Sequence, residues 1–116
     1  MFSRLLVSVA LFVASFPAFG SDYNVALVLD KAGKDDQSFN SSAYRGIQKA
    51  ERELGIKFKT VEVKDAASSE SMLRALAGKN FDLMIAIGFS HAGAVAKVAP
   101  SFPKSKFVIV DSEVKQ

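Results

Sequence analysis

The sequence of 116 residues contains no cysteine. Without cysteine no disulfide can form, so a folded domain must be held together by packing alone. The lipid-modified cysteine that anchors many exported bacterial proteins is missing as well. We therefore expect any mature, exported form to be free in its compartment.

Neither sign of charge dominates the sequence, and no run of basic residues is present. Fifteen Lys and Arg residues face twelve Asp and Glu residues, which gives a formal net charge of +3. The two signs are interspersed along the chain. This pattern argues against nucleic acid or a membrane surface as the main partner.

A long apolar run occurs once, at the beginning of the chain. Arg4 supplies a short positive region, residues 5–16 are largely apolar, and Pro17 ends the run before Ala18-Phe19-Gly20. The run is shorter than the roughly 20 apolar residues that a membrane-spanning helix needs. This order is typical of a secretory signal peptide, so we expect residues 1–20 to be removed after Gly20 and the protein to reach the periplasm. The alternative is an uncleaved segment that anchors the protein in the membrane.

Residues 21–116 are long enough for one small domain but not for two. Short apolar runs alternate with segments in which apolar residues recur at three- and four-residue spacing. The runs predict strands at residues 23–29, 58–63, 83–87 and 107–110. The spaced segments predict helices that end at Gly55, Gly78 and Pro100, over residues 39–54, 68–77 and 92–99. Strands joined by helices require a parallel sheet, so we expect a doubly wound α/β lobe, flavodoxin-like or Rossmann-like, with strand order 2-1-3-4.

Ligands of such sheets bind beyond the carboxyl ends of the strands, where the strand order reverses. The predicted order places this point between the first and third strands. The segments to consider are residues 30–40, residues 88–93, and Asp111 with Ser112. In the first of them, Phe39 and Asn40 offer a stacking face and a two-sided hydrogen-bonding group at a helix start. The alternative interpretation is that Ser38 caps the helix, Phe39 belongs to the core and the acidic residues are solvated.

The segment Asp-Asp-Gln-Ser-Phe-Asn-Ser-Ser-Ala-Tyr-Arg-Gly, residues 35–46, resembles the signature of the basic membrane protein family. These proteins are substrate-binding components of ABC transporters, and many of them bind purine nucleosides. The usual form of the signature is close to D-K-S-F-N-x-S-A-x-x-G, and Gln37 replaces its common Lys. The resemblance continues through residues 85–89 and 107–111, and it covers nearly all of residues 23–113. It implies one lobe of a type I periplasmic binding protein.

The resemblance also implies roles for four side chains at the rim of the sheet. Phe39 would stack on a nucleobase, and Asn40 would form a hydrogen bond with a polar edge of the ligand. Asp30 and Asp111 would accept hydrogen bonds from ribose hydroxyls or base N–H groups, because ionised carboxylates only accept.

The resemblance implies supporting roles for four further residues. Ser90 and the backbone near Gly88 would line the same rim. Asp36 and Ser38 belong to the signature, and Asp36 would order the loop. No metal and no cofactor are expected.

Receptors of this family close two lobes on a ligand and deliver it to a membrane permease. The sequence supplies residues for the first lobe, and we expect the second lobe to be absent. If a complete site gives micromolar affinity, about 8 kcal/mol, half of that free energy leaves roughly millimolar affinity. We therefore expect a non-enzymatic, partial solute-binding protein with weak affinity.

An enzymatic interpretation has less support from the residues. The segment Gly88-Phe89-Ser90-His91-Ala92-Gly93 resembles the hydrolase motif G-x-S-x-G, but its second glycine comes one residue late. His91 is adjacent to Ser90 in sequence, whereas the histidine of a triad comes from elsewhere in the fold. Ser90 as a helix N-cap explains the position without chemistry.

Metal and phosphate sites are also disfavoured. A magnesium-dependent phosphatase that used Asp30 and Asp111 would need a second aspartate at position 32, where the sequence has Ala32. His91 is the single histidine, so it has no companion for a metal site, and no glycine-rich phosphate loop follows the first strand.

The alternative from another class is an interaction module. A four-stranded open sheet exposes the edge of its fourth strand, which can pair with another chain. A degenerate half-receptor could therefore dimerise through this edge without binding a ligand.

Overall fold

The computed structural model describes residues 22–115, so the predicted signal peptide lies outside the described residues. The chain forms a four-stranded sheet in the order β2-β1-β3-β4, with all neighbours parallel. The strands are β1 (Asn24–Leu29), β2 (Lys57–Glu62), β3 (Leu83–Ile87) and β4 (Lys106–Val110). This confirms the predicted doubly wound architecture and its strand order.

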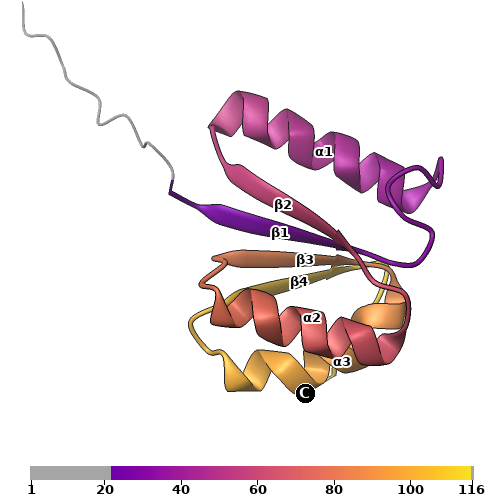
Figure 1. Cartoon of the computed structure of the whole chain (residues 1–116), viewed down its shortest axis with the longest axis vertical. Helices are drawn as coiled ribbons and strands as arrows, with labels where there is room; N and C mark the ends of the chain where they lie inside the picture. The colour runs from indigo at the N-terminus through magenta and orange to yellow at the C-terminus, as the bar shows by residue number, and fades with distance from the viewer. Residues whose placement is uncertain (1–21, 116) are drawn as a thin grey trace, which may run out of the picture.

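Helices cover both faces of the sheet (Figure 1). Helix α1 (Phe39–Leu54) lies on one face, and α2 (Ala66–Gly78) and α3 (Ala92–Val98) lie on the other. Two short 3₁₀ turns, η1 (Phe89–His91) and η2 (Ala99–Ser101), flank α3. Within residues 22–115, none of these helices is long and apolar enough to cross a membrane.

The helix ends follow local capping chemistry. Gly55 ends α1 in a left-handed conformation, with φ of 67°, and its N–H donates to the Glu51 carbonyl. Helix α2 begins two residues before the predicted start because the Asp65 side chain accepts a hydrogen bond of 2.7 Å from the Ser68 N–H. A carboxylate at this position satisfies a donor that has no partner within the helix.

Strand β1 is the centre of the core and is buried on both faces. Its alternate residues supply two separate clusters, as the two-residue period of a strand requires. Val25, Leu27 and Leu29 pack with Ile47 of α1 and with Ile87. Ala26 and Val28 pack against α2, α3 and β3, in a cluster with Leu73, Met84 and Val98. A parallel strand buried in this way needs a continuous apolar run, which explains the sequence of β1.

Part of the α1 face of the sheet is left uncovered. Val108 and Val110 of β4 point to this side and are exposed. Beside them a groove of about 420 Å³ runs between α1 and the strands β1, β3 and β4. Its lining is almost entirely apolar: Leu27, Phe39, Ser42, Ala43, Gly46, Ile47, Ala50, Ile85, Ile87 and Val110.

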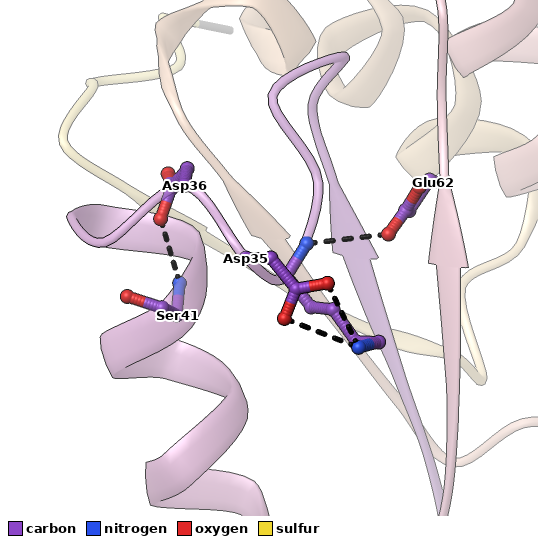
Figure 2. A network of polar contacts seen from close by, with 5 residues as sticks. Asp35, Asp36, Ser41 and Glu62 are labelled. Carbon is purple, nitrogen blue, oxygen red and sulfur yellow. Dashed lines mark hydrogen bonds and ion pairs between the residues drawn. The ribbon is translucent and has the colours of Figure 1, made fainter.

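The start of α1 is set by Asp36 and not by Ser38. Ser38 occupies the N-cap position, but its side chain makes no capping hydrogen bond. The Asp36 carboxylate instead accepts from the backbone N–H groups of Ser38, Asn40 and Ser41 at 2.8, 3.1 and 3.0 Å; Figure 2 shows the bond to Ser41. The interpretation of Ser38 as the capping side chain is therefore wrong.

These hydrogen bonds also change the acidity of Asp36. Desolvation alone would raise the pKa of its carboxyl, but the N–H donors of Ser38, Ser41 and Asn40 together outweigh it and lower the pKa below its ordinary value of 3.8. The ionised form therefore stabilises the fold.

We expect Asp36→Ala to lower the melting temperature by several degrees at neutral pH, because three backbone donors lose their acceptor. The stabilisation is present above the ordinary pKa of 3.8 and is lost as the pH falls below it. The difference between wild type and variant should therefore shrink in acid, as followed by circular dichroism. Asp35→Ala is the matched control, because Asp35 is exposed and contacts its neighbour Lys34. Equal effects of the two substitutions would contradict this account.

Candidate functional site

The carboxyl ends of β1, β3 and β4 bring the predicted site residues to one edge of the sheet. Asp30 follows β1, Gly88 follows β3 and Asp111 follows β4. Phe39 and Asn40 open α1 at the same edge. The structure thus places these five residues at the rim that the topology predicted.

Asp30 is held in place by contacts from two sides. Its Oδ1 atom accepts hydrogen bonds from Asn40 Nδ2 at 2.7 Å and from the Ala32 N–H at 2.9 Å. Its Oδ2 atom faces the turn after β3, since a Cβ atom on Gly88 would lie 3.5 Å from it. One carboxylate oxygen is therefore fixed by the protein, and the other faces the turn at the rim.

Asn40 is buried, with 1% of its surface exposed, and its described hydrogen bonds hold the loop together. Its Oδ1 atom has no hydrogen-bond partner among residues 22–115. The contact with a ligand that the resemblance implies for Asn40 stays a prediction. What the structure shows is that Asn40 orients Asp30.

Phe39 presents its ring to the rim and does not belong to the core. Its side chain is 58% exposed, although it lies in the first turn of α1. The ring lines the end of the apolar groove, near Ile87 and Val110. The interpretation of Phe39 as a core residue is therefore wrong, and an exposed aromatic face is available for stacking.

The backbone is unusual where β3 and β4 end. Gly88 has φ of 103°, a conformation that residues with a Cβ rarely adopt, and its N–H donates to the Val110 carbonyl at 3.0 Å. Asp111 has φ of 64° and an exposed side chain. Left-handed backbone at a residue other than glycine is uncommon, although Asp tolerates it. The strained position at this rim is therefore Asp111, whereas Gly88 adopts its positive φ without steric cost.

Ser90 lies in η1 and is exposed. Helix α3 begins at Ala92 with His91 at the N-cap position and no capping side-chain hydrogen bond, so the interpretation of Ser90 as N-cap is wrong. The His91 ring does not serve Ser90 either, because its Nδ1 atom lies 2.7 Å from Ser69 Oγ. This arrangement offers no support for a Ser–His nucleophile pair.

The loop before α1 is attached to the end of β2 by Glu62. Its Oε1 atom accepts a hydrogen bond of 3.2 Å from the Lys34 N–H (Figure 2). Gly33 has φ of 70°, and a Cβ atom there would lie 2.9 Å from Glu62 Oε1. Glycine at position 33 therefore permits the close approach. Glu62 was not among the predicted site residues, and its one signal in the sequence is a charge at the end of a strand beside β1.

A second pocket, which was not predicted from the sequence, lies at the same edge of the sheet. Phe89 is 75% exposed, whereas His91 is buried with 1% of its surface exposed. Both lie at this pocket of about 410 Å³, formed by the segments that follow β1, β2 and β3. Its lining is Asp30, Lys31, Val63, Lys64, Asp65, Ala66, Phe89, Ser90 and His91. In the part of the chain that the structure describes, no three His, Asp or Glu side chains are grouped to hold a metal ion.

Comparison with known proteins gives a consistent family. A family model described as ABC transporter substrate-binding protein PnrA-like matches residues 23–116. An uncharacterized lipoprotein of Pyrococcus horikoshii is 35% identical over 80% of this chain and 23% of its own length. The ABC transporter nucleoside-binding protein BmpA of Lactococcus lactis is 34% identical over 82% of this chain and 28% of its own.

Solved structures agree with this assignment. An ABC transporter solute-binding protein from Aeropyrum pernix K1 matches with a TM-score of 0.76 and 31% identity, over 80% of this chain and 25% of that one. A lipoprotein fragment from Peptoclostridium difficile 630 matches with a TM-score of 0.73 and 31% identity, over 80% of this chain and 76% of that one.

The chain spans about a quarter of the length of the curated relatives it matches. The match nevertheless includes every strand of the sheet and every residue of the rim described above. The resemblance seen in the sequence is thereby confirmed, and the chain belongs to the family of PnrA-like ABC transporter substrate-binding proteins.

Proposed function

We propose that this chain is a ligand-binding lobe of an exported receptor for an ABC importer, and that it takes a nucleoside-like ligand at the rim. The observation that carries the proposal is the arrangement of Asp30, Asn40 and Phe39. The Asp30 carboxylate is fixed by the buried Asn40 amide at 2.7 Å, and the residue before Asn40 in α1 is Phe39, whose ring is 58% exposed. A flat ligand with hydroxyl and N–H groups suits an acceptor next to a stacking face.

The proposed roles follow from these positions. Phe39 stacks on the base, and the carboxylates of Asp30 and Asp111 accept hydrogen bonds from the ligand. Asn40 acts through Asp30, and Ser90 lines the rim with the backbone of Gly88. The name of BmpA from Lactococcus lactis, a nucleoside-binding protein, supports a purine nucleoside as the ligand class.

The same proposal includes export and a membrane partner. A cleaved signal peptide at residues 1–20 would deliver the protein to the periplasm, where a permease would receive the ligand. Relatives from Pyrococcus are named lipoproteins, whereas this sequence has no cysteine to carry a lipid. We therefore propose a periplasmic form free of a lipid anchor, with an uncleaved signal as the alternative anchor. Family membership and the absence of a Ser90–His91 pair in the described structure favour a receptor over an enzyme.

The affinity of this lobe alone should be low. Receptors that bury most of a ligand use two walls, and this chain corresponds to about a quarter of its curated relatives. We expect dissociation constants on the order of millimolar, about half of the binding free energy of a micromolar site.

We expect adenosine or inosine to shift the backbone amide resonances of the rim in an NMR titration, and uridine to shift them less. Phe39→Ala and Asp111→Asn should each weaken binding by about tenfold or more, because a stacking face or a charged acceptor is lost. Leu54→Ala and Glu113→Gln are matched controls, since Leu54 is exposed at the far end of α1 and Glu113 lies just beyond the rim. A folded protein whose rim resonances do not move at several millimolar nucleoside would refute the proposed function.

Self-association is a second candidate, favoured by the exposed apolar side of β4. Val108 and Val110 are exposed next to the apolar groove, and β4 has a strand on one side only within the described sheet. Unpaired edges with apolar neighbours tend to pair with another chain. We propose a second copy of this chain as the partner.

Charge along β4 fits an antiparallel pairing of two copies. Lys104 and Lys106 lie at its start, and Asp111 and Glu113 follow its end. Antiparallel pairing brings the basic end of one strand to the acidic end of the other. Opposite charges at neighbouring cross-strand positions are stabilising.

Sedimentation equilibrium should accordingly show a monomer–dimer equilibrium that depends on protein concentration. Val108→Lys should shift it toward monomer, because a charge enters the apolar contact. Leu54→Lys places the same charge at an exposed apolar position at the far end of α1 and should leave the equilibrium unchanged. A strictly monomeric wild type at high protein concentration would eliminate this candidate.

A further inference from the structure

Ser69 and His91 are buried polar side chains that the proposed ligand contacts do not use. Each is 1% exposed, and the Ser69 Oγ and His91 Nδ1 atoms are 2.7 Å apart. Ser69 lies in the first turns of α2 and His91 ends η1, so the bond joins two elements that are 22 residues apart in sequence. Buried polar groups are costly unless they are paired, which makes this bond a specific link between the two elements.

The link supports the turn that faces Asp30. The His91 N–H donates to the Gly88 carbonyl at 3.2 Å, and the Gly88 N–H donates to Val110 at the end of β4. A Cβ atom on Gly88 would lie 3.5 Å from Asp30 Oδ2 and 3.9 Å from Ser90 Oγ. A displacement of His91 would therefore move Ser90 and the Gly88 backbone relative to the Asp30 carboxylate.

The second nitrogen of His91 has no partner among the described residues. Burial lowers the pKa of His91 below its ordinary value of 6.5, and the nearby Asp30 carboxylate opposes this shift. The ring is therefore neutral at neutral pH. When the ring takes a proton, both of its nitrogens are N–H donors, and Asp30 is the carboxylate whose charge acts on the ring.

Other charged groups surround the pair on every packed element. Lys31, Lys64 and Asp65 line the same pocket as His91. Next to Ser69 in α2, Glu70 pairs with Arg74 at 3.0 Å and with Lys97 of α3 at 3.6 Å. Glu70 is thus engaged by two cations, and the Asp65 carboxylate accepts from the Ser68 N–H at the start of α2. Asp30 is the carboxylate whose charge acts on His91.

We propose that Ser69 and His91 are positioning residues for the ligand site: their bond holds the Gly88–His91 turn against Asp30, and protonation of His91 weakens ligand binding. Protonation draws the Asp30 carboxylate toward the imidazolium and away from the ligand. This inference rests on the proposed ligand-binding function at the rim.

The test compares dissociation constants at about pH 7.5 and about pH 5, by NMR titration with whichever of adenosine, inosine and uridine binds most tightly. The lower pH is set well below the ordinary histidine pKa of 6.5, because burial lowers the pKa of His91. Wild type should bind roughly three- to tenfold more weakly at the lower pH, which corresponds to a ligand-linked pKa change of about half to one unit. His91→Gln introduces a side-chain amide that can pair with Ser69 but cannot take a proton. It should bind like wild type at the higher pH and lose this pH dependence.

The Ser69 side of the pair has its own variants. Ser69→Ala should weaken binding at both pH values, and Ser69→Thr, which retains the hydroxyl, should restore it. Ser71→Ala is the matched control, because Ser71 is exposed on the same helix and bonds within it to the Ala67 carbonyl. An unchanged pH profile in His91→Gln, or equal affinities of Ser69→Ala and Ser71→Ala, would overturn the inference.

Failure of the proposed function can be told apart from failure of this inference. If no nucleoside shifts the rim of wild type at the higher pH, the proposed function fails. The positioning role is then tested without ligand, by following the amide resonances of Phe89 and Ser90 as the pH is lowered. In wild type these resonances should shift as His91 takes a proton. In His91→Gln the shift should be absent. If these resonances do not shift when His91 is protonated, the positioning role is refuted as well.

Discussion

The burial of β1 on both faces is the constraint on which the rest of the structure depends. Five consecutive residues from Val25 to Leu29 have almost no exposed surface. One set of side chains requires α1 as a cover and the other requires α2 and α3. Because β1 ends at the rim of the sheet, Asp30 is the first residue after the buried run that can be polar. The site thus begins where the apolar run of the core stops.

The loop after β1 then has two tasks, and separate carboxylates perform them. Asp36 satisfies the backbone donors at the start of α1, and Glu62 fixes the Lys34 backbone to the end of β2. With these contacts made elsewhere, Asp30 receives Asn40 on one oxygen and keeps the other beside the Gly88 turn. Asp30 thus contacts the loop through Oδ1 and has Oδ2 beside the Gly88 turn, so its loop contacts and the proposed ligand contact can use different oxygens.

The sequence was sufficient for the sheet because its signals are local and repeated. Each strand is a short apolar run and each helix has a stop at or near Gly or Pro, so strand order and helix positions follow from pattern and crossover rules. The rim could also be predicted, since topology alone brings Asp30, Gly88 and Asp111 to one edge. The Ser-Phe-Asn segment identified the family, which the pattern of apolar residues could not do.

Other features of the site depend on three-dimensional contacts that have no local signal. Ser38 and Asp36 are both competent to cap α1, and the path of the loop decides between them. Phe39 has the spacing of a core residue, but its ring lines the open apolar groove and is 58% exposed. Ser69 and His91 form a hydrogen bond although they are 22 residues apart in sequence, and neither segment has a pattern that predicts this contact.

The fixed geometry of the rim is consistent with the weak binding proposed for this lobe. Gly88 and Asp111 have fixed, unusual backbone conformations, and Asp30 is held by two hydrogen bonds. A preorganised site loses little conformational entropy when a ligand arrives. Low affinity would then come from contacts that this lobe does not supply, and not from disorder of those it does. Variants that loosen the rim should therefore lower affinity because more conformational entropy is lost on binding. Addition of a second lobe should raise affinity because it buries more of the ligand surface.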